Sequence, residues 1–126
     1  GENEYTRWGF KQLIEANAAQ VLNADAQVLG GITEWKKVAD LAMSSHVLLA
    51  PHGDQEIHAH LVASVPNGLI AEYYDNNTNA LLKDMFPEPI RLNELGQIMV
   101  PQAPGLGVEI EYERIRPYCT YSSDDK

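Results

Sequence analysis

Residues 46–72 read HVLLAPHGDQEIHAHLVASVPNGLIAE, and this stretch decides the fold class. It begins with a largely apolar run at 46–50, which suits a strand buried on both faces. A helix is predicted from about residue 55 to 65, and the Pro66-Asn67-Gly68 turn ends it. A second buried strand is predicted at 69–71. The order strand, helix, strand is typical of parallel α/β proteins.

The chain before residue 46 continues the same alternation. A helix is predicted from about Thr6, a suitable N-cap, to Ala18, and another from about Thr33 to Ser44. Between them, the short apolar stretch Val21-Leu22 leads to a polar loop. The apolar faces that the two helices should bury are formed by Phe10, Leu13, Ile14 and Ala18, and by Trp35, Val38, Ala39 and Ala42.

Composition narrows the class of protein. The 126 residues carry a formal charge of −9 without clusters of basic residues, so nucleic acid and anionic membranes are not expected partners. No segment is apolar for long enough to span a bilayer. The single cysteine, Cys119, cannot form an internal disulfide, which favours a reducing, cytoplasmic location. Because the chain starts at Gly1 rather than Met, we expect it to be a piece of a longer polypeptide.

Chemistry-bearing residues recur at regular intervals along the chain. Glu2 lies at its start, and Asp25, His52 and Glu72 each stand where an apolar run gives way to a polar loop. Each is separated from the next by roughly one strand-plus-helix unit. In a (β/α) barrel the catalytic groups line the C-terminal ends of successive strands, so such spacing lets distant side chains converge on one pocket.

Five motifs in this order resemble the C-terminal half of enolase-superfamily enzymes of the mandelate racemase type. The resemblance extends over nearly the whole chain. The motifs are Gly1-Glu2-Asn3, Asp25 with Gly30-Gly31-Ile32-Thr33, Pro51-His52 with Gln55-Glu56-Ile57 and Ala59-His60-Leu61, Glu72-Tyr73, and Pro104-Gly105-Leu106-Gly107-Val108.

The resemblance implies a fold in two parts. Residues 1–85 would form the C-terminal half of a (β/α)8 TIM-type barrel, strands 5–8. Residues 86–126 would form a C-terminal tail that packs on a capping domain missing from this chain. A complete barrel takes about 250 residues, and half a barrel leaves two unpaired edges. The expected partners are therefore the remainder of the same polypeptide or a complementary chain, and a homo-oligomer is the expected assembly.

The resemblance also implies a role for each of the four residues. Glu2 would be one of the carboxylate ligands of a catalytic Mg²⁺, whose other ligands lie outside this chain. His52 would be the general base that removes the proton α to the substrate carboxylate, giving an enediolate. Asp25 would bond the far ring nitrogen of His52 and fix its tautomer, and Glu72 would meet the substrate carboxylate opposite the metal.

The implied activity is that of a Mg²⁺-dependent sugar-acid dehydratase, a lyase, which would be inactive as this piece alone. The alternatives are a racemase or epimerase of a 2-hydroxy carboxylate, an isomerase, and a non-catalytic barrel module. Dehydration and racemisation share the first proton transfer and differ in what acts opposite His52. Intact carboxylate ligands in the preceding part of the polypeptide would indicate an enzyme, and their loss would indicate a module.

A second reading of the histidines is a zinc site formed by His52, Glu56, His58 and His60. The helical spacing of the neighbouring apolar residues argues against it, because positions i and i+2 of a helix point away from each other. On that helix His60 is expected to be packed and His58 exposed. Trp8 and Trp35 are expected to be packing residues rather than ligand platforms.

Overall fold

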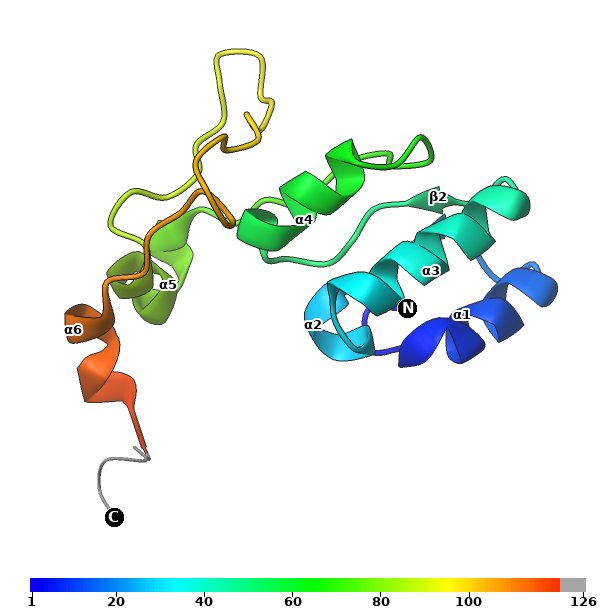
Figure 1. Cartoon of the computed structure of the whole chain (residues 1–126), viewed down its shortest axis with the longest axis horizontal. Coiled ribbons are helices and arrows are strands. Elements are labelled where there is room, and N and C mark those ends of the chain that lie inside the picture. Colours follow the sequence, from blue (N-terminus) through cyan, green and yellow to red (C-terminus); the bar gives the residue numbers. More distant parts are fainter. Residues whose placement is uncertain (121–126) are drawn as a thin grey trace. The chain divides into compact units, whose positions relative to one another are not determined.

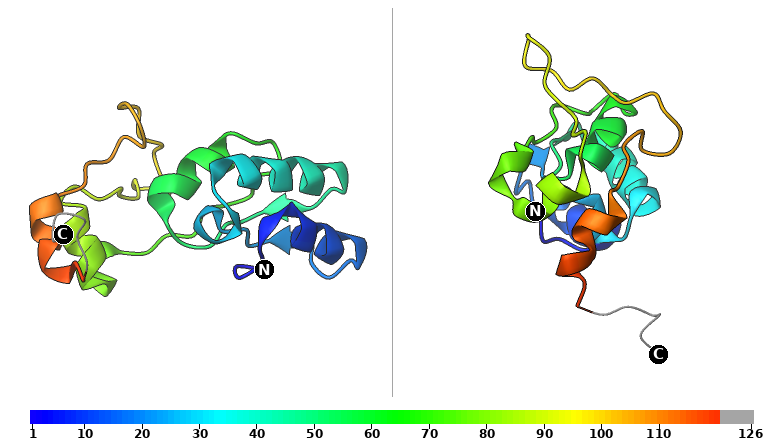
Figure 2. Two further views of the ribbon diagram at one scale, coloured as in Figure 1. Left: turned by 60° about the horizontal axis from the view of Figure 1, so that its bottom comes forward. Right: turned by 90° about the vertical axis from the view of Figure 1, so that its left-hand side faces the viewer.

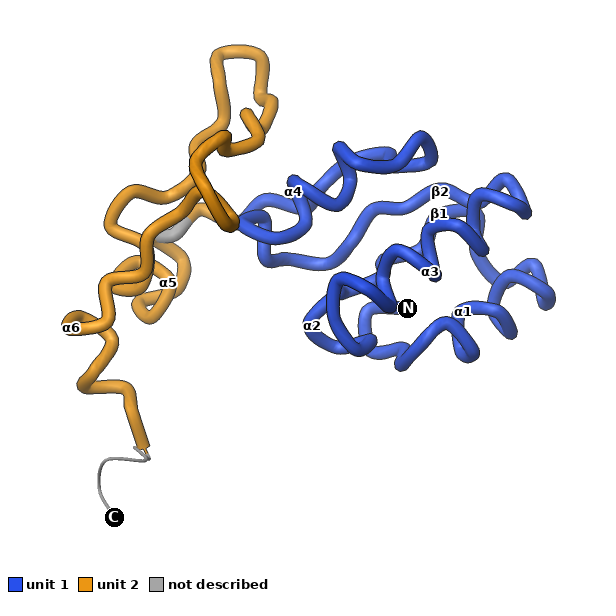
Figure 3. The backbone as a smooth tube through the Cα atoms, viewed as in Figure 1, with its two compact units in different colours: residues 1–74 blue, residues 75–126 orange. Residues whose placement is uncertain are grey.

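The computed structural model describes residues 1–120 (Figure 1 and Figure 2). The chain forms two compact units, Gly1–Tyr74 and Asp75–Lys126 (Figure 3). Among the described residues no helix is both long and apolar enough to cross a membrane.

The first unit alternates helices with short parallel strands. Its elements are α1 Thr6–Glu15, β1 Val21–Leu22, α2 Ala26–Leu29, α3 Ile32–Ser44, β2 Leu48–Leu49 and α4 Gln55–Ala63. The two strands pair in parallel, with Leu22 opposite Leu49. Leu49 also forms an isolated parallel bridge with Gly68, so a third segment lies beside β2. The predicted α/β class is confirmed for this unit.

Helices α1 and α3 lie side by side and hold the core of the first unit (Figure 1). The predicted face of α3 is confirmed, since Trp35, Val38, Ala39 and Ala42 are all buried. The Trp35 indole N–H donates to the Ala24 carbonyl oxygen at 2.9 Å. A large aromatic side chain thus fills the core while its single polar atom is satisfied, which fastens α3 to the loop after β1.

The predictions for α1 are confirmed only in part. Phe10 and Ile14 are buried, but the helix ends at Glu15, so Ala18 lies outside it. Tyr5, not Thr6, is the N-cap residue, and no side chain caps this helix end. The prediction that Trp8 packs was wrong, because its side chain is 59 % exposed and lies under the Arg7 guanidinium, 4.5 Å from the ring centroid.

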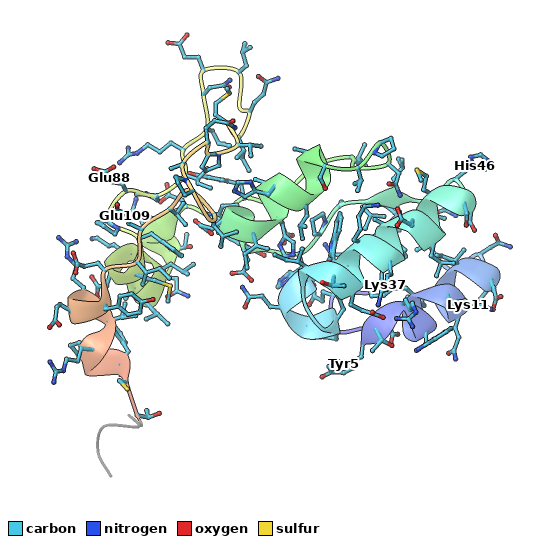
Figure 4. The ribbon with its side chains drawn as sticks, viewed as in Figure 1. Tyr5, Lys11, Lys37, His46, Glu88 and Glu109 are labelled. Carbon is cyan, nitrogen blue, oxygen red and sulfur yellow. The ribbon has the colours of Figure 1, made fainter. Side chains whose placement is uncertain are left out.

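An ion pair joins α1 to α3 at their solvent side. Both Glu34 carboxylate oxygens accept hydrogen bonds of 2.8 Å from Arg7 Nη1, and the Arg7 backbone N–H donates to Glu34 at 3.0 Å. Lys37, labelled in Figure 4, contributes a second positive partner at 3.4 Å. The Arg7 backbone hydrogen bond, aided by both cations, lowers the pKa of Glu34.

The turn after α4 brings the chain very close to that helix. A Cβ atom added at Gly68 would lie 2.3 Å from the Val62 carbonyl oxygen, so no larger residue fits there without a shift of the backbone. The neighbouring Asn67 is buried, and its Nδ2 donates to the carbonyl oxygens of Ala39 and Val47 at 3.1 Å each. These contacts explain why the predicted Pro-Asn-Gly turn is needed here.

The apolar run at 69–71 does not form the predicted buried strand. Leu69 and Ile70 are 54 % and 62 % exposed, and Leu48 in β2 is 37 % exposed. Among residues 1–120, only the bridge at Gly68 joins this segment to the sheet. A strand becomes buried on both faces only when neighbouring elements cover it, and the first unit supplies no such cover here. The prediction of fully buried strands was therefore wrong for this chain.

The second unit contains short helices and an extended segment. Its elements are η1 Asn76–Thr78, α5 Ala80–Met85, α6 Tyr112–Ile115 and η2 Arg116–Tyr118. The Tyr118 hydroxyl donates to Asp84 at 2.7 Å, which joins the end of the described chain to α5. Within residues 90–100 an antiparallel bridge joins Leu92 to Ile98. The tail is therefore helical at residues 112–118.

Candidate active site

Asp25 and His52 follow the ends of the two paired strands. Asp25 comes after β1, and His52 comes after β2 and Pro51. Because parallel strands end at the same edge of a sheet, their following loops lie side by side. The structure brings the two side chains together, with 3.2 Å between His52 Nδ1 and Asp25 Oδ2.

Each carboxylate oxygen of Asp25 has its own partner. Oδ1 accepts a hydrogen bond of 2.7 Å from the Gln27 backbone N–H and so caps α2. Oδ2 faces the His52 ring. The Asp25 side chain is 5 % exposed and that of His52 is 36 % exposed, so a fixed, buried acid meets an imidazole that solvent or a ligand can reach.

The environment favours the charged form of His52. The hydrogen bond to Asp25 is the largest cause that raises the pKa of His52; partial burial opposes it, and the charges of Glu2 and Glu72 add to it. With Asp25 as an anionic acceptor, Nδ1 carries the proton of that bond and Nε2 is left for a reacting group. This is the arrangement in which a carboxylate orients a general base.

Asp25→Asn is expected to lower the pKa of His52, because it removes the charge that stabilises the imidazolium. The amide oxygen can still cap α2 at Gln27, so the helix should persist. A raised folded-state pKa means that His52 stabilises the fold below about pH 6.5, its ordinary pKa, and that this stabilisation is lost as pH rises through the folded-state pKa. The variant should therefore lose more stability at pH 5 than at pH 9.

The measurements for Asp25→Asn are an NMR titration of the His52 ring and urea unfolding at both pH values. Asp40→Asn is the matched control, since Asp40 is exposed on α3 and pairs with Lys36. An unchanged His52 titration in Asp25→Asn would contradict the assigned cause of the shift.

Glu72 lies on the same side of the site as His52. Its Oε2 accepts hydrogen bonds from the Gly53 backbone N–H at 2.7 Å and from the Tyr74 hydroxyl at 3.1 Å. Gly53 directly follows His52, so the acid is tied to the loop that carries the histidine. The role of Glu72 at a substrate carboxylate stays a prediction.

Tyr74 and Gln55 also lie at this site, although the sequence did not indicate that they contact each other. The Tyr74 ring stands edge-on to the His52 ring, with 6.4 Å between centroids, and its bond to Glu72 raises the pKa of the Tyr74 phenol. The buried Gln55 amide pairs with both backbone groups of Tyr74, at 3.0 Å and 3.3 Å. These residues lie 19 positions apart, so only the folded chain reveals the contact.

His58 was predicted to be exposed, and this was wrong. Its side chain is completely buried in α4. Its Nε2 accepts the Ala26 backbone N–H at 3.0 Å, and its Nδ1 lies 2.8 Å from the Gly53 carbonyl oxygen. The spacing of the apolar residues in α4 had indicated a buried face that excludes His58. The residues of α4 that are buried in the structure are Gln55, Glu56, His58, Ala59 and Leu61. With both ring nitrogens held by backbone groups, His58 is not placed to bind zinc.

Glu2 lies next to the other ring nitrogen of His52. Its Oε2 is 3.9 Å from His52 Nε2, and its side chain is 49 % exposed. A carboxylate is a hard oxygen donor of the kind that Mg²⁺ prefers, so Glu2 fits the role of one ligand. Residues 1–120 contain no group of three or more His, Cys, Asp or Glu side chains that could hold a metal by themselves. Further ligands would have to come from outside the described chain.

Comparison with known proteins identifies the class. A family model described as enolase C-terminal domain-like matches residues 1–115. The chain therefore belongs to the enolase superfamily and is of the mandelate racemase type, as the sequence motifs predicted.

Its relatives include enzymes of sugar-acid metabolism. The chain is 32 % identical over 124 residues to an L-rhamnonate dehydratase from Saccharopolyspora erythraea, covering 94 % of this chain and 32 % of that protein. It is 31 % identical to a 3,6-anhydro-alpha-L-galactonate cycloisomerase from Streptomyces coelicolor, covering 91 % of this chain and 30 % of that protein. The chain thus spans about a third of the length of the curated relatives it matches.

A solved relative has the same fold. The crystal structure of an L-talarate dehydratase from a Polaromonas species, complexed with Mg and L-glucarate, superposes with a TM-score of 0.79 at 34 % identity. The match covers 90 % of this chain and 30 % of that one. This chain and that relative therefore share the enolase C-terminal domain-like fold as well as sequence similarity.

Proposed function

We propose that this chain forms the C-terminal half, strands 5–8, of the (β/α)8 barrel of a Mg²⁺-dependent sugar-acid dehydratase. The observation that carries the proposal is the 3.2 Å contact between Asp25 and His52 at the ends of adjacent parallel strands, with Glu2 3.9 Å from His52 Nε2 and Glu72 bound to the Gly53 N–H. The names of the relatives support a sugar acid as substrate, since several of them are dehydratases of such acids.

In the proposed reaction His52 removes the proton α to the substrate carboxylate through Nε2, while Asp25 holds the ring by Nδ1. The C–H electron pair moves into the carboxylate to give an enediolate. The His52 imidazolium then returns its proton to the departing β-hydroxyl, which leaves as water and takes the C–O electron pair. The remaining enol tautomerises to a 2-keto-3-deoxy acid. A base with a pKa near the working pH suits both proton transfers.

Glu72 and Glu2, the acidic residues beside His52, have separate roles in the proposed reaction. Glu72, held by Gly53 and Tyr74, would donate or share a proton with the substrate carboxylate, on the side opposite a bound Mg²⁺. Glu2 would hold Mg²⁺, which supplies Lewis-acid stabilisation of negative charge on the substrate carboxylate when bound. Because this chain contributes one carboxylate to that site, we infer that it is inactive without the rest of its barrel.

Two other functions share most of these features. A racemase or epimerase of a 2-hydroxy carboxylate uses the same first proton transfer but returns a proton to the opposite face. A non-catalytic module would keep the barrel without the metal ligands of the preceding strands. The dehydratases among the relatives, an L-rhamnonate dehydratase and an L-talarate dehydratase, favour the dehydratase.

The proposal extends to the whole polypeptide. Residues 1–85 belong to the barrel and residues 86–126 return towards a capping domain, with the remaining strands supplied by the same polypeptide or a complementary chain. The exposed Leu69 and Ile70 support a neighbour at that edge of the sheet. A homo-oligomeric, cytoplasmic enzyme is the form that we propose.

The test is an activity screen of the complete polypeptide and of residues 1–126 alone. With Mg²⁺, the complete protein should convert at least one sugar acid to a 2-keto-3-deoxy acid, which semicarbazide detects by absorbance. EDTA should abolish the signal and Mg²⁺ should restore it. Racemisation without loss of water, seen by polarimetry, would support the isomerase instead. No conversion and no exchange of the α-proton with D₂O for any acid would support the module.

A further inference from the structure

A completely buried histidine connects the two loops that carry the proposed catalytic pair. His58 lies in the first turns of α4 and is 0 % exposed. Its Nε2 accepts a hydrogen bond of 3.0 Å from the backbone N–H of Ala26, the residue after Asp25. Its Nδ1 is 2.8 Å from the carbonyl oxygen of Gly53, the residue after His52.

The partners of His58 define its protonation. A backbone N–H can only donate, so Nε2 must present a lone pair to Ala26. A carbonyl oxygen can only accept, so Nδ1 must carry the proton that it donates to Gly53. The ring is therefore neutral, with its proton on Nδ1. Nε2 also lies 3.8 Å from Asp25 Oδ1, beyond hydrogen-bonding distance.

The second loop is held from its other side as well. The Gly53 N–H donates to Glu72 at 2.7 Å, so the backbone on both sides of the Gly53 Cα is fixed. Gly53 and the following Asp54 both have left-handed backbone angles, with φ of 55° and 39°. Such a conformation at a non-glycine residue persists only where the surroundings hold it. His58 thus supports a strained loop directly beside His52.

We infer that His58 is a positioning residue, which sets the distance and orientation between Asp25 and His52 without touching the substrate. The expected change in rate rests on the proposed function. The expected change in the geometry of Asp25 and His52 does not depend on any substrate. Small displacements matter here, because misplacing a catalytic group by about 1 Å can cost on the order of 10²-fold in rate. A purely apolar side chain of similar volume would fill the space and leave both backbone groups without a partner.

The experiment uses three variants of the complete protein. His58→Leu removes both hydrogen bonds. His58→Asn keeps an amide donor for the Gly53 carbonyl, and His58→Gln keeps a carbonyl acceptor that can reach Ala26. His46→Asn is the matched control, because His46 is exposed beyond the end of α3 (Figure 4).

For folded protein, His58→Leu should lower kcat on the order of 10²-fold, with KM changed by less than about threefold, since binding is not the function removed. His58→Asn and His58→Gln should recover part of the loss. In ¹⁵N NMR, the Nδ1–H signal of His52 in its bond to Asp25 should weaken or shift in all three variants and remain in the control.

Several results would overturn the assignment. If His58→Leu folds and keeps its kcat, or loses only stability, His58 is an ordinary core residue. If His58→Leu does not fold, the partial variants decide by the His52 Nδ1–H signal, and an unchanged signal in both rejects the role. If the unaltered protein turns over no sugar acid, the proposed function fails, and the same NMR signal still tests whether His58 positions the pair.

Discussion

His52→Asn is expected to reduce turnover of the sugar acid by about 10³-fold or more in the complete enzyme, because it removes the general base. The amide can still donate to Asp25 in place of Nδ1–H, and the side chain is partly exposed, so the fold should be preserved. The variant should also stop exchange of the substrate α-proton with solvent from the His52 face. Proton NMR in D₂O measures this exchange separately from the loss of water.

His46→Asn makes the same chemical change at an exposed position outside the site and should leave both rates unaltered. Circular dichroism establishes that the two variants are folded. Full turnover in folded His52→Asn would contradict the mechanism, since His52 is the residue with one ring nitrogen beside Asp25 and the other beside Glu2.

The second large effect is expected for Glu2→Gln. This change replaces a charged oxygen ligand with a neutral amide and should weaken Mg²⁺ binding and abolish measurable turnover. Loss of a residue that merely orients a metal ligand costs about 10- to 100-fold in metal affinity, so loss of a ligand should cost at least the upper value. Isothermal titration calorimetry of the complete enzyme measures the affinity.

Glu4→Gln is the control for Glu2→Gln, because Glu4 lies two residues away and its Oε1 accepts the Tyr5 backbone N–H. Glu2→Gln should also lower the pKa of His52, since the charge of Glu2 contributes to raising it. A Mg²⁺ affinity equal to that of the unaltered enzyme would take Glu2 out of the metal site, whatever happens to the rate.

Local pattern determined the helices more fully than the strands. The residues of α3 between Trp35 and Ala42 that the helical period places on one face are buried. This face could be predicted because helix amphipathicity depends on the sequence of a single segment. The strands β1 and β2 contain two residues each, far less than the apolar run at 46–50 suggested. Strand length depends on neighbours that pair with it, and these are not encoded in the strand itself.

The candidate site, too, was predicted only in part from the sequence. Asp25, His52, Glu2 and Glu72 could be singled out from sequence because each stands at a strand end or in a motif of the enolase superfamily. The contact between Asp25 and His52 joins residues 27 positions apart, and it lies where the parallel register of β1 and β2 places it. The catalytic roles of the four residues remain predictions.

The supporting residues were found only in the folded chain. The apolar residues of α4 predicted a buried face without His58, so His58 was wrongly expected to be exposed to solvent. Tyr74 and Gln55 meet across 19 residues through backbone hydrogen bonds that leave no mark in composition or period. Which residues support a site through backbone contacts depends on which loops lie next to each other in the folded chain.

The sequence by itself therefore determined the helical faces, the family and the candidate chemical groups, because period, turn residues and motifs are properties of short segments. The tertiary structure decided which strand ends pair, which histidine is buried and which face of the sheet stays exposed. Those outcomes depend on hydrogen bonds and burial between segments far apart in the chain. Leu69 and Ile70 are the clearest example. Their apolar character predicts burial, but burial requires a neighbour that the first unit does not contain.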